Sequence, residues 1–89
     1  MTSTQTTLTL PTVHLNGTSR KRLTDDYQAA YEKLIEFRDS FRSIEFNARD
    51  YYVQSNIAFS EARTERDIME HKIGSLMQYL EAHIIHLAS

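Results

Sequence analysis

The stretch 23–44, LTDDYQAAYEKLIEFRDSFRSI, decides the fold, because its apolar residues recur at alternating steps of four and three. The positions are Leu23, Tyr27, Ala30, Leu34, Phe37, Phe41 and Ile44, and Tyr31 and Ile35 widen the stripe. This spacing is typical of a helix that packs along another helix. It predicts a helix over residues 20–45.

A second stripe with the same spacing follows in the C-terminal half. Its positions are Ala58, Ala62, Met69, Ile73, Leu76, Leu80, His83 and Leu87. Glu65 and Arg66 interrupt it, which predicts a gap opposite Phe41 where a ligand or a second protomer could enter. Ser55 or Asn56 can cap this helix, which should reach residue 87. Joined by the irregular stretch 46–56, the two helices predict an all-α antiparallel hairpin.

The N-terminal residues 1–11 are rich in Thr, Ser and Gln, a composition too polar to fold alone. We expect a disordered or extended arm there, followed by one helical-hairpin domain over 12–89. Residues 12–15 could form a brief strand, and Asn16-Gly17 is a strong turn signal because both residues tolerate positive φ. Thr18 or Ser19 can then cap the first helix.

Size and composition favour self-association. A hairpin of 89 residues buries little apolar surface alone, and its stripes are wider than one partner helix covers. We therefore expect a homo-oligomer. The net charge of −2 argues against binding along duplex nucleic acid, and no apolar run approaches the ~20 residues that span a bilayer. The absence of cysteine suits the reducing cytoplasm.

Basic residues crowd the expected start of the first helix, where Arg20, Lys21 and Arg22 add to a positive helix dipole. Two interpretations are open. These cations could bind phosphate together with the free backbone donors and the nearby Asn-Gly turn. Alternatively, Asp25 and Asp26 offset them.

The connection between the helices holds more polar and aromatic side chains than a plain hairpin needs. Arg49, Asp50 and Tyr51 provide donors, an acceptor and a stacking face, so we expect a ligand-binding or turn-fixing role. Arg63 and Arg66 follow closely. They either extend this basic group or form a solvated, salt-bridged surface with the acidic residues among them.

Other chemistry is weakly indicated. His83 and His86 could coordinate one metal ion, but the sequence places no third ligand at a suitable position. No pattern of a catalytic nucleophile and no glycine-rich phosphate loop is recognisable. We expect neither an enzyme nor a cofactor. Tyr27 is a better candidate for a ligand-binding residue. A tyrosine in a helix contact either packs there or stacks on a nucleotide base.

Three segments carry a resemblance: Thr-Val-His-Leu-Asn-Gly-Thr at 12–18, the pair Asp26-Tyr27, and Phe-Asn-Ala-Arg-Asp-Tyr-Tyr at 46–52. Over residues 12–88 the chain resembles small tailed-phage proteins of the hairpin domain shared by an anti-CBASS sponge and a Thoeris anti-defence sponge. The resemblance implies a non-catalytic phage protein in the host cytoplasm. Such a protein sequesters cyclic di- or trinucleotide second messengers so that immune effectors stay off.

The resemblance also implies a homo-oligomer, typically a hexamer, with cyclic dinucleotides held between protomers. Its stacking tyrosine and phosphate-binding cation are best matched by Tyr27 together with Phe41 and Arg42. The Arg and Thr of its trinucleotide site have no clear counterpart. Tyr27 and Arg42 are 15 residues apart, or roughly 22 Å along a helix. One small ligand can therefore meet both only where two chains lie antiparallel.

The full set of expected ligand-binding residues is Tyr27, Phe41, Arg42, Arg49, Asp50, Tyr51, Arg63, Arg66, Arg20 and Lys21. An alternative function is an interaction protein whose apolar stripe binds a host or phage protein.

Overall fold

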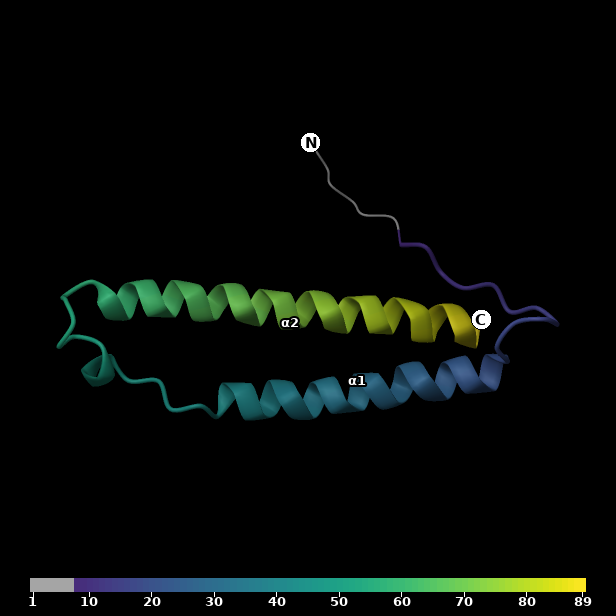
Figure 1. Ribbon diagram of the computed structural model, residues 1–89, viewed down its shortest axis with the longest axis horizontal. Coiled ribbons are helices and arrows are strands. Elements are labelled where there is room, and N and C mark those ends of the chain that lie inside the picture. Colours follow the sequence, from purple (N-terminus) through teal and green to yellow (C-terminus); the bar gives the residue numbers. More distant parts are fainter. Residues whose placement is uncertain (1–7) are drawn as a thin grey trace, which may run out of the picture.

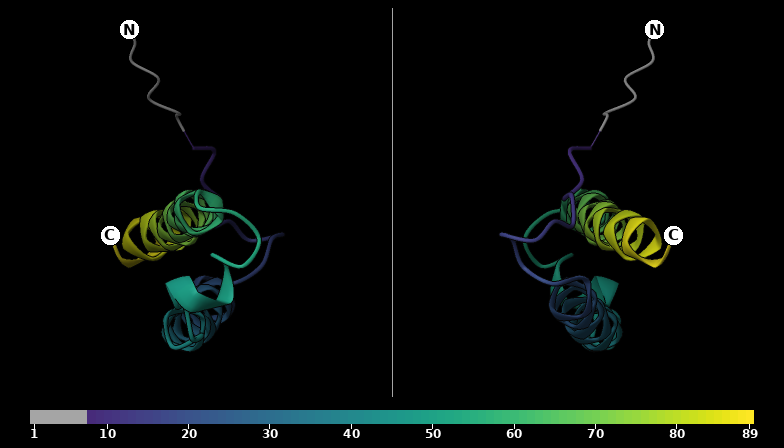
Figure 2. Two further views of the ribbon diagram at one scale, coloured as in Figure 1. Left: turned by 90° about the vertical axis from the view of Figure 1, so that its left-hand side faces the viewer. Right: turned by 90° about the vertical axis from the view of Figure 1, so that its right-hand side faces the viewer.

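The computed structural model describes residues 8–89, which form two long helices side by side (Figure 1). Helix α1 spans Arg20–Arg42, the short 3-10 helix η1 spans Ala48–Asp50, and α2 spans Ala58–Ala88. The end-on views in Figure 2 show one pair of antiparallel helices. The predicted all-α hairpin is confirmed. The strand expected at 12–15 was wrong, since residues 8–89 contain no strand.

Helix α1 begins as predicted and ends earlier. Ser19 is its N-cap, and its Oγ accepts a hydrogen bond from the backbone N–H of Arg22 at 3.1 Å. At the other end the Ser43 hydroxyl donates to the carbonyl of Ser40 at 2.8 Å. A serine side chain that bonds to a neighbouring backbone carbonyl competes with helix continuation, and α1 ends at Arg42 instead of residue 45.

Helix α2 starts without the expected cap. Its N-cap position is Ile57, which provides no side-chain hydrogen bond, so the prediction of Ser55 or Asn56 was wrong. The Ser55 Oγ instead accepts a 3.4 Å bond from the N–H of Ile57, one residue before the helix. The first turn of α2 includes Phe59, whose ring packs against residues of the connection. Tertiary packing therefore sets this helix start.

The chain before α1 lies against the C-terminal end of α2 (Figure 1). A ring nitrogen of His86 is 2.7 Å from the carbonyl oxygen of Pro11. The predicted Asn16-Gly17 turn is confirmed by a 3.1 Å bond from Gly17 N–H to the His14 carbonyl, but it uses no positive φ. A Cβ there would lie 2.7 Å from Nε2 of the exposed His14 side chain, which can turn away, so the space at Gly17 does not require glycine. Of the expected arm, residues 1–7 lie outside the described part, and 8–11 form neither helix nor strand.

The contact between the helices buries few side chains. Within residues 8–89 only Ile73, His83 and Leu87 are fully buried, all on α2. Tyr27, Leu34 and Phe41 of the predicted stripe are half-buried, as expected. This small core is consistent with the size argument above.

One flank of the predicted stripe was assigned incorrectly. Ala30 and Phe37 are exposed, whereas Tyr31 and Arg38 are half-buried in their place. The reason is polar: the Tyr31 hydroxyl donates to Glu81 Oε2 at 2.5 Å, and Arg38 Nη1 lies 3.5 Å from the sulfur of Met77. These contacts to α2 turn that side of α1 inward.

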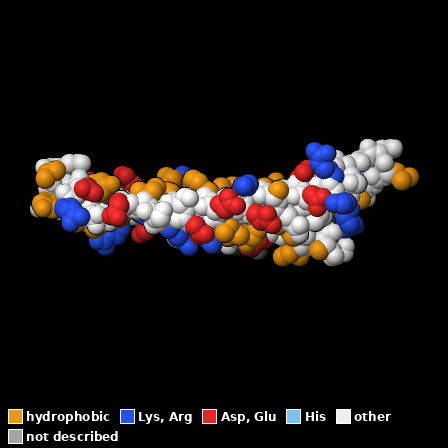
Figure 3. All heavy atoms as spheres, turned by 90° about the horizontal axis from the view of Figure 1, so that it is seen from below, with side chains coloured by type: hydrophobic (Ala, Val, Ile, Leu, Met, Phe, Trp, Pro, Cys, Tyr) orange, Lys and Arg blue, Asp and Glu red, His pale blue; other side chains and the backbone are white. Residues whose placement is uncertain are grey.

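Ile44, Met69 and Leu76 of the predicted stripes are also exposed. Together with Phe37 and Tyr79 they form a row of exposed apolar residues, which we name the apolar flank. Its members are Phe37, Ile44, Met69, Leu76 and Tyr79, each about half exposed. Ile44 and Met69 line one groove, and Phe37 and Leu76 lie two helical turns from them on the same side. Seen from the α1 side, charged side chains of both signs alternate with hydrophobic ones (Figure 3).

Candidate functional site

An aromatic cluster fills the end of the hairpin where the chain turns. The ring of Phe46 lies 5.0 Å from that of Phe59 and 5.6 Å from that of Tyr51, and Tyr51 and Phe59 are 6.0 Å apart. Distances in this range are typical of packed aromatic rings. The cluster joins the connection to the first turn of α2, so it positions the polar groups of η1 beside that helix.

Arg66 occupies the place where the sequence predicted a gap. Its guanidinium lies 4.8 Å from the ring centre of Phe46 and 5.4 Å from that of Phe41. The same group donates to the carbonyls of Phe41 and Arg42 at 3.4 Å and of Ile44 at 3.5 Å. Arg66 therefore caps the negative end of α1 while it stacks on two aromatic faces.

A groove of about 360 Å³ opens beside this arginine. It is lined by Phe41, Ile44, Glu45, Phe46, Tyr51, Ala62, Glu65, Arg66 and Met69. Ligand sites are commonly apolar and aromatic with a few polar groups, and this volume is at the small end of their range. The groove brings together three of the predicted ligand residues, namely Phe41, Tyr51 and Arg66.

Other predicted residues near the turn lie outside the groove. Arg49 and Asp50 are exposed in η1, and Arg63 lies over the ring of Phe59 at 5.0 Å. Arg42 forms a bidentate ion pair with Glu70, with Nη2 to Oε1 at 3.1 Å. These hydrogen bonds raise the pKa of the Arg42 guanidinium above its ordinary value. Its Nε and Nη2 atoms both bond to Glu70.

The remaining predicted residues lie at the opposite end of the hairpin. The ring of Tyr27 stacks on that of His83, with ring centres 4.6 Å apart, and His83 is in turn 4.4 Å from Tyr79. The stacking face of Tyr27 is therefore occupied by His83 of the same chain.

The sequence left two interpretations open for the basic first turn, phosphate binding and pairing with Asp25 and Asp26. Lys21 is paired, because its amine lies 2.7 Å from the Asp25 carboxylate, and this hydrogen bond raises the pKa of the amine.

Arg20 has a different role that mirrors that of Arg66. Its guanidinium donates to the carbonyl of Leu87 and lies 3.5 Å from that of Ser89. Each helix thus has its C-terminal carbonyls covered by an arginine from the other helix. Sequence reasoning missed these caps, and it missed Phe46 and Phe59 as groove-building rings, although their spacing around the connection was visible.

No family model matches this sequence, and no similar curated protein or solved structure was found. Within residues 8–89, no group of three His, Asp or Glu side chains is placed to hold a metal ion. None of the described helices has the length and apolar character needed to cross a membrane.

Proposed function

We propose that the protein is a phage anti-defence sponge that binds cyclic di- or trinucleotide immune messengers in the host cytoplasm and leaves them intact. The observation that carries this proposal is the groove at the turn, where the rings of Phe41 and Tyr51 stand beside the guanidinium of Arg66. Aromatic faces stack on nucleotide bases, and an arginine fork pairs with phosphate. The groove thus combines the two contacts that a single nucleotide needs.

The cation in this groove can change partners. The Arg66 bonds to the carbonyls are 3.4–3.5 Å long, whereas arginine pairs with anionic oxygens at about 2.7–2.9 Å. A phosphate would therefore compete well for the outer face of this guanidinium. Its stacking on Phe41 and Phe46 holds the group in place during that exchange.

The groove is open at one edge, where Ile44 and Met69 continue into the exposed apolar flank. A volume of about 360 Å³ suits one nucleotide better than two. A cyclic dinucleotide has two similar halves, so two grooves related by a two-fold axis would hold it between protomers. Self-association, as the resemblance implies, would complete the site.

The test is calorimetric titration of the full chain with a panel of cyclic di- and trinucleotides. Tyr51→Leu removes a stacking face from the groove and keeps apolar bulk, and Tyr52→Leu is the matched control on an exposed ring. We expect the Kd of the best ligand to rise at least ten-fold, about 1.4 kcal/mol, in Tyr51→Leu only. Tyr27→Leu tests the assignment that the resemblance implies, and a loss there alone would move the pocket to the other end.

The fate of the ligand tests the mechanism. Sequestration needs only stacking and phosphate contacts, so the bound nucleotide should be recovered intact after denaturation, with or without chelator. Linearised nucleotide in the chromatogram would identify an enzyme and reject the proposal. Absence of binding across the whole panel would also reject it.

The second candidate is an interaction protein for a host or phage protein. The exposed apolar flank favours it, because contiguous apolar surface commonly marks a protein interface. Binding to that flank by another protein, without any nucleotide response in the titration, is the result that would support it.

A further inference from the structure

The side of the hairpin opposite the apolar flank carries charged residues from both helices, and we name it the charged flank. Its members are Arg38, Arg42, Arg63, Asp67, Glu70 and Glu81. The ion pair between Arg42 and Glu70 places those two residues on it. Arg63 lies two helical turns before Glu70, and Asp67 lies four turns before Glu81, so all four α2 residues face the same side.

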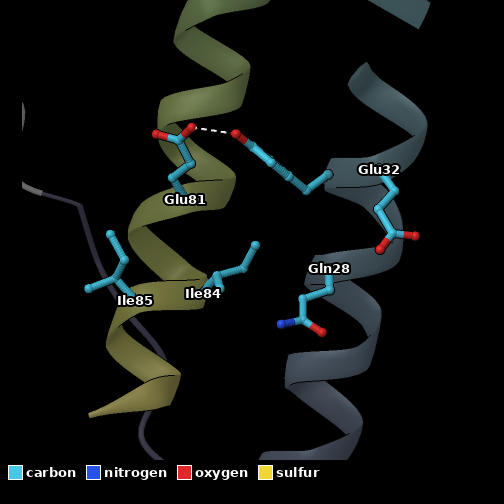
Figure 4. A pocket seen from close by; sticks show the side chains of 6 residues that line it. Gln28, Glu32, Glu81, Ile84 and Ile85 are labelled. Carbon is cyan, nitrogen blue, oxygen red and sulfur yellow. Dashed lines mark hydrogen bonds between the residues drawn. The ribbon is translucent and has the colours of Figure 1, made fainter. Parts of the chain in front are cut away.

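A pocket of about 400 Å³ lies on this flank near the chain termini (Figure 4). Ile84 and Ile85 form an apolar wall, and the carboxylates of Glu32 and Glu81 stand on the helices that border it. Glu81 accepts the hydroxyl of Tyr31 through one oxygen. An arginine fits this combination, because its stem is apolar and its head is a cation that pairs with carboxylates.

Two cations of the flank form no hydrogen bond to a carboxylate within the described residues. The Nε atom of Arg38 is buried without a hydrogen bond and forms only a long ion pair with Asp39, whose Oδ1 is 3.8 Å away. The Arg63 guanidinium lies over the ring of Phe59 and forms no ion pair within the described residues. On the acidic side, the Asp67 carboxylate forms no ion pair or side-chain hydrogen bond in residues 8–89.

These charges are arranged symmetrically about one point of α2. Arg63 and Glu81 lie nine residues on either side of Lys72, and Asp67 and Met77 lie five residues on either side of it. Met77 is the residue that contacts Arg38. A two-fold axis at the level of Lys72 therefore brings Arg63 of one copy to the Glu81 pocket of the other, and Asp67 to Arg38.

We propose that the charged flank is an isologous interface for a second copy of this chain, with the two α2 helices antiparallel. Each Arg63 enters the pocket of the other copy beside Glu81, and each Asp67 pairs with the other copy's Arg38. Because of the two-fold axis, each of the two ion pairs forms twice, once in each direction across the interface. This is how a self-complementary surface binds its own copy. The interface is separate from the nucleotide groove and does not depend on it.

The test exchanges charges between two variants, Arg63→Glu and Glu81→Arg. Alone, each variant places like charges together at both ends of the interface, so its self-association should weaken at least ten-fold in sedimentation at low salt. Mixed in equal amounts, the two variants regain opposite charges at both contacts. The mixture should therefore recover the association of the parent protein.

Recovery on mixing cannot come from a misfolded chain, and far-ultraviolet circular dichroism of each variant checks that the helices persist. Glu36→Arg is the matched control, because it reverses a charge on the exposed side of α1 away from this flank. Three results would overturn the proposal: a monomeric parent, an Arg63→Glu variant that associates like the parent, or a mixture that stays dissociated.

Discussion

Two arginines act at the scale of single residues to close the helices of this hairpin. Helix C-termini expose carbonyls and carry partial negative charge, and a glycine commonly ends them. Neither α1 nor α2 ends on glycine. Instead Arg66 covers the end of α1 and Arg20 covers the end of α2, so each cap also ties one helix to the other.

Replacing Arg66 with methionine tests this role. Met keeps the apolar stem and removes the three carbonyl contacts, so we expect the free energy of unfolding to fall by about 1 kcal/mol. Denaturant melting measures the change. Lys33→Met is the control, since it removes only an exposed pair with Glu36 and should change stability little. Equal effects of both substitutions would contradict the capping role.

Tyr31 gives the hairpin a dependence on alkaline pH. Its hydrogen bond to Glu81, followed by burial, raises the pKa of the phenol above the ordinary value of about 10. The folded state thus holds this proton more tightly than the unfolded chain. The resulting stability is complete below the ordinary pKa and is lost as the pH rises through the raised one.

We therefore expect the stability difference between the parent and Tyr31→Phe to shrink above about pH 10. Thermal melting between pH 8 and pH 11 measures it. Tyr52→Phe, which removes the same hydroxyl from an exposed ring, is the matched control. A difference that grows with pH in Tyr31→Phe would contradict this assignment.

At the scale of elements, the sequence predicted the helices well because helical periodicity is local information. It predicted their contact less well, because which flank of α1 faces α2 depends on partners such as Glu81 that lie 50 residues away in the chain. The same limit applies to the site. The residues of the connection were recognisable, but the capping role of Arg66 follows only once α1 is known to end beside it.

Gly74 is the weak point of α2 and offers a test of that helix. A Cβ added there would meet no atom within 4 Å, so Gly74→Ala should gain about 1 kcal/mol from helix propensity. Denaturant melting extrapolated to low protein concentration measures the stability of the hairpin itself. Ser75→Ala, at the adjacent exposed position, should gain less. A loss of stability in Gly74→Ala at this limit would contradict the open space seen around it.

At the scale of the whole molecule, the hairpin has a small core for its length. Three fully buried side chains in residues 8–89 are few, and the apolar flank remains exposed. Burying that flank against another chain would remove exposed apolar surface from water. This is the physical ground for the expected homo-oligomer.

We expect sedimentation at micromolar concentration to show several chains, and Leu76→Lys to reduce that number. Leu76 is more than half exposed at 55%, so a lysine there leaves the contact between α1 and α2 intact. The control is Gln78→Lys, which adds the same charge at an exposed position outside the apolar flank. Unchanged association in Leu76→Lys would show that the flank is not an interface.

The aromatic cluster at the turn also has a consequence for how the chain folds. Phe46 and Phe59 are thirteen residues apart, whereas Arg20 and Leu87 are separated by 67. Closing a short loop costs less entropy than closing a long one, so contacts at the turn can form first and bring the helices into register. The hairpin should therefore nucleate at this cluster and form its remaining contacts toward the termini. The contacts of Arg20 and Pro11 with the end of α2 should form last and open first.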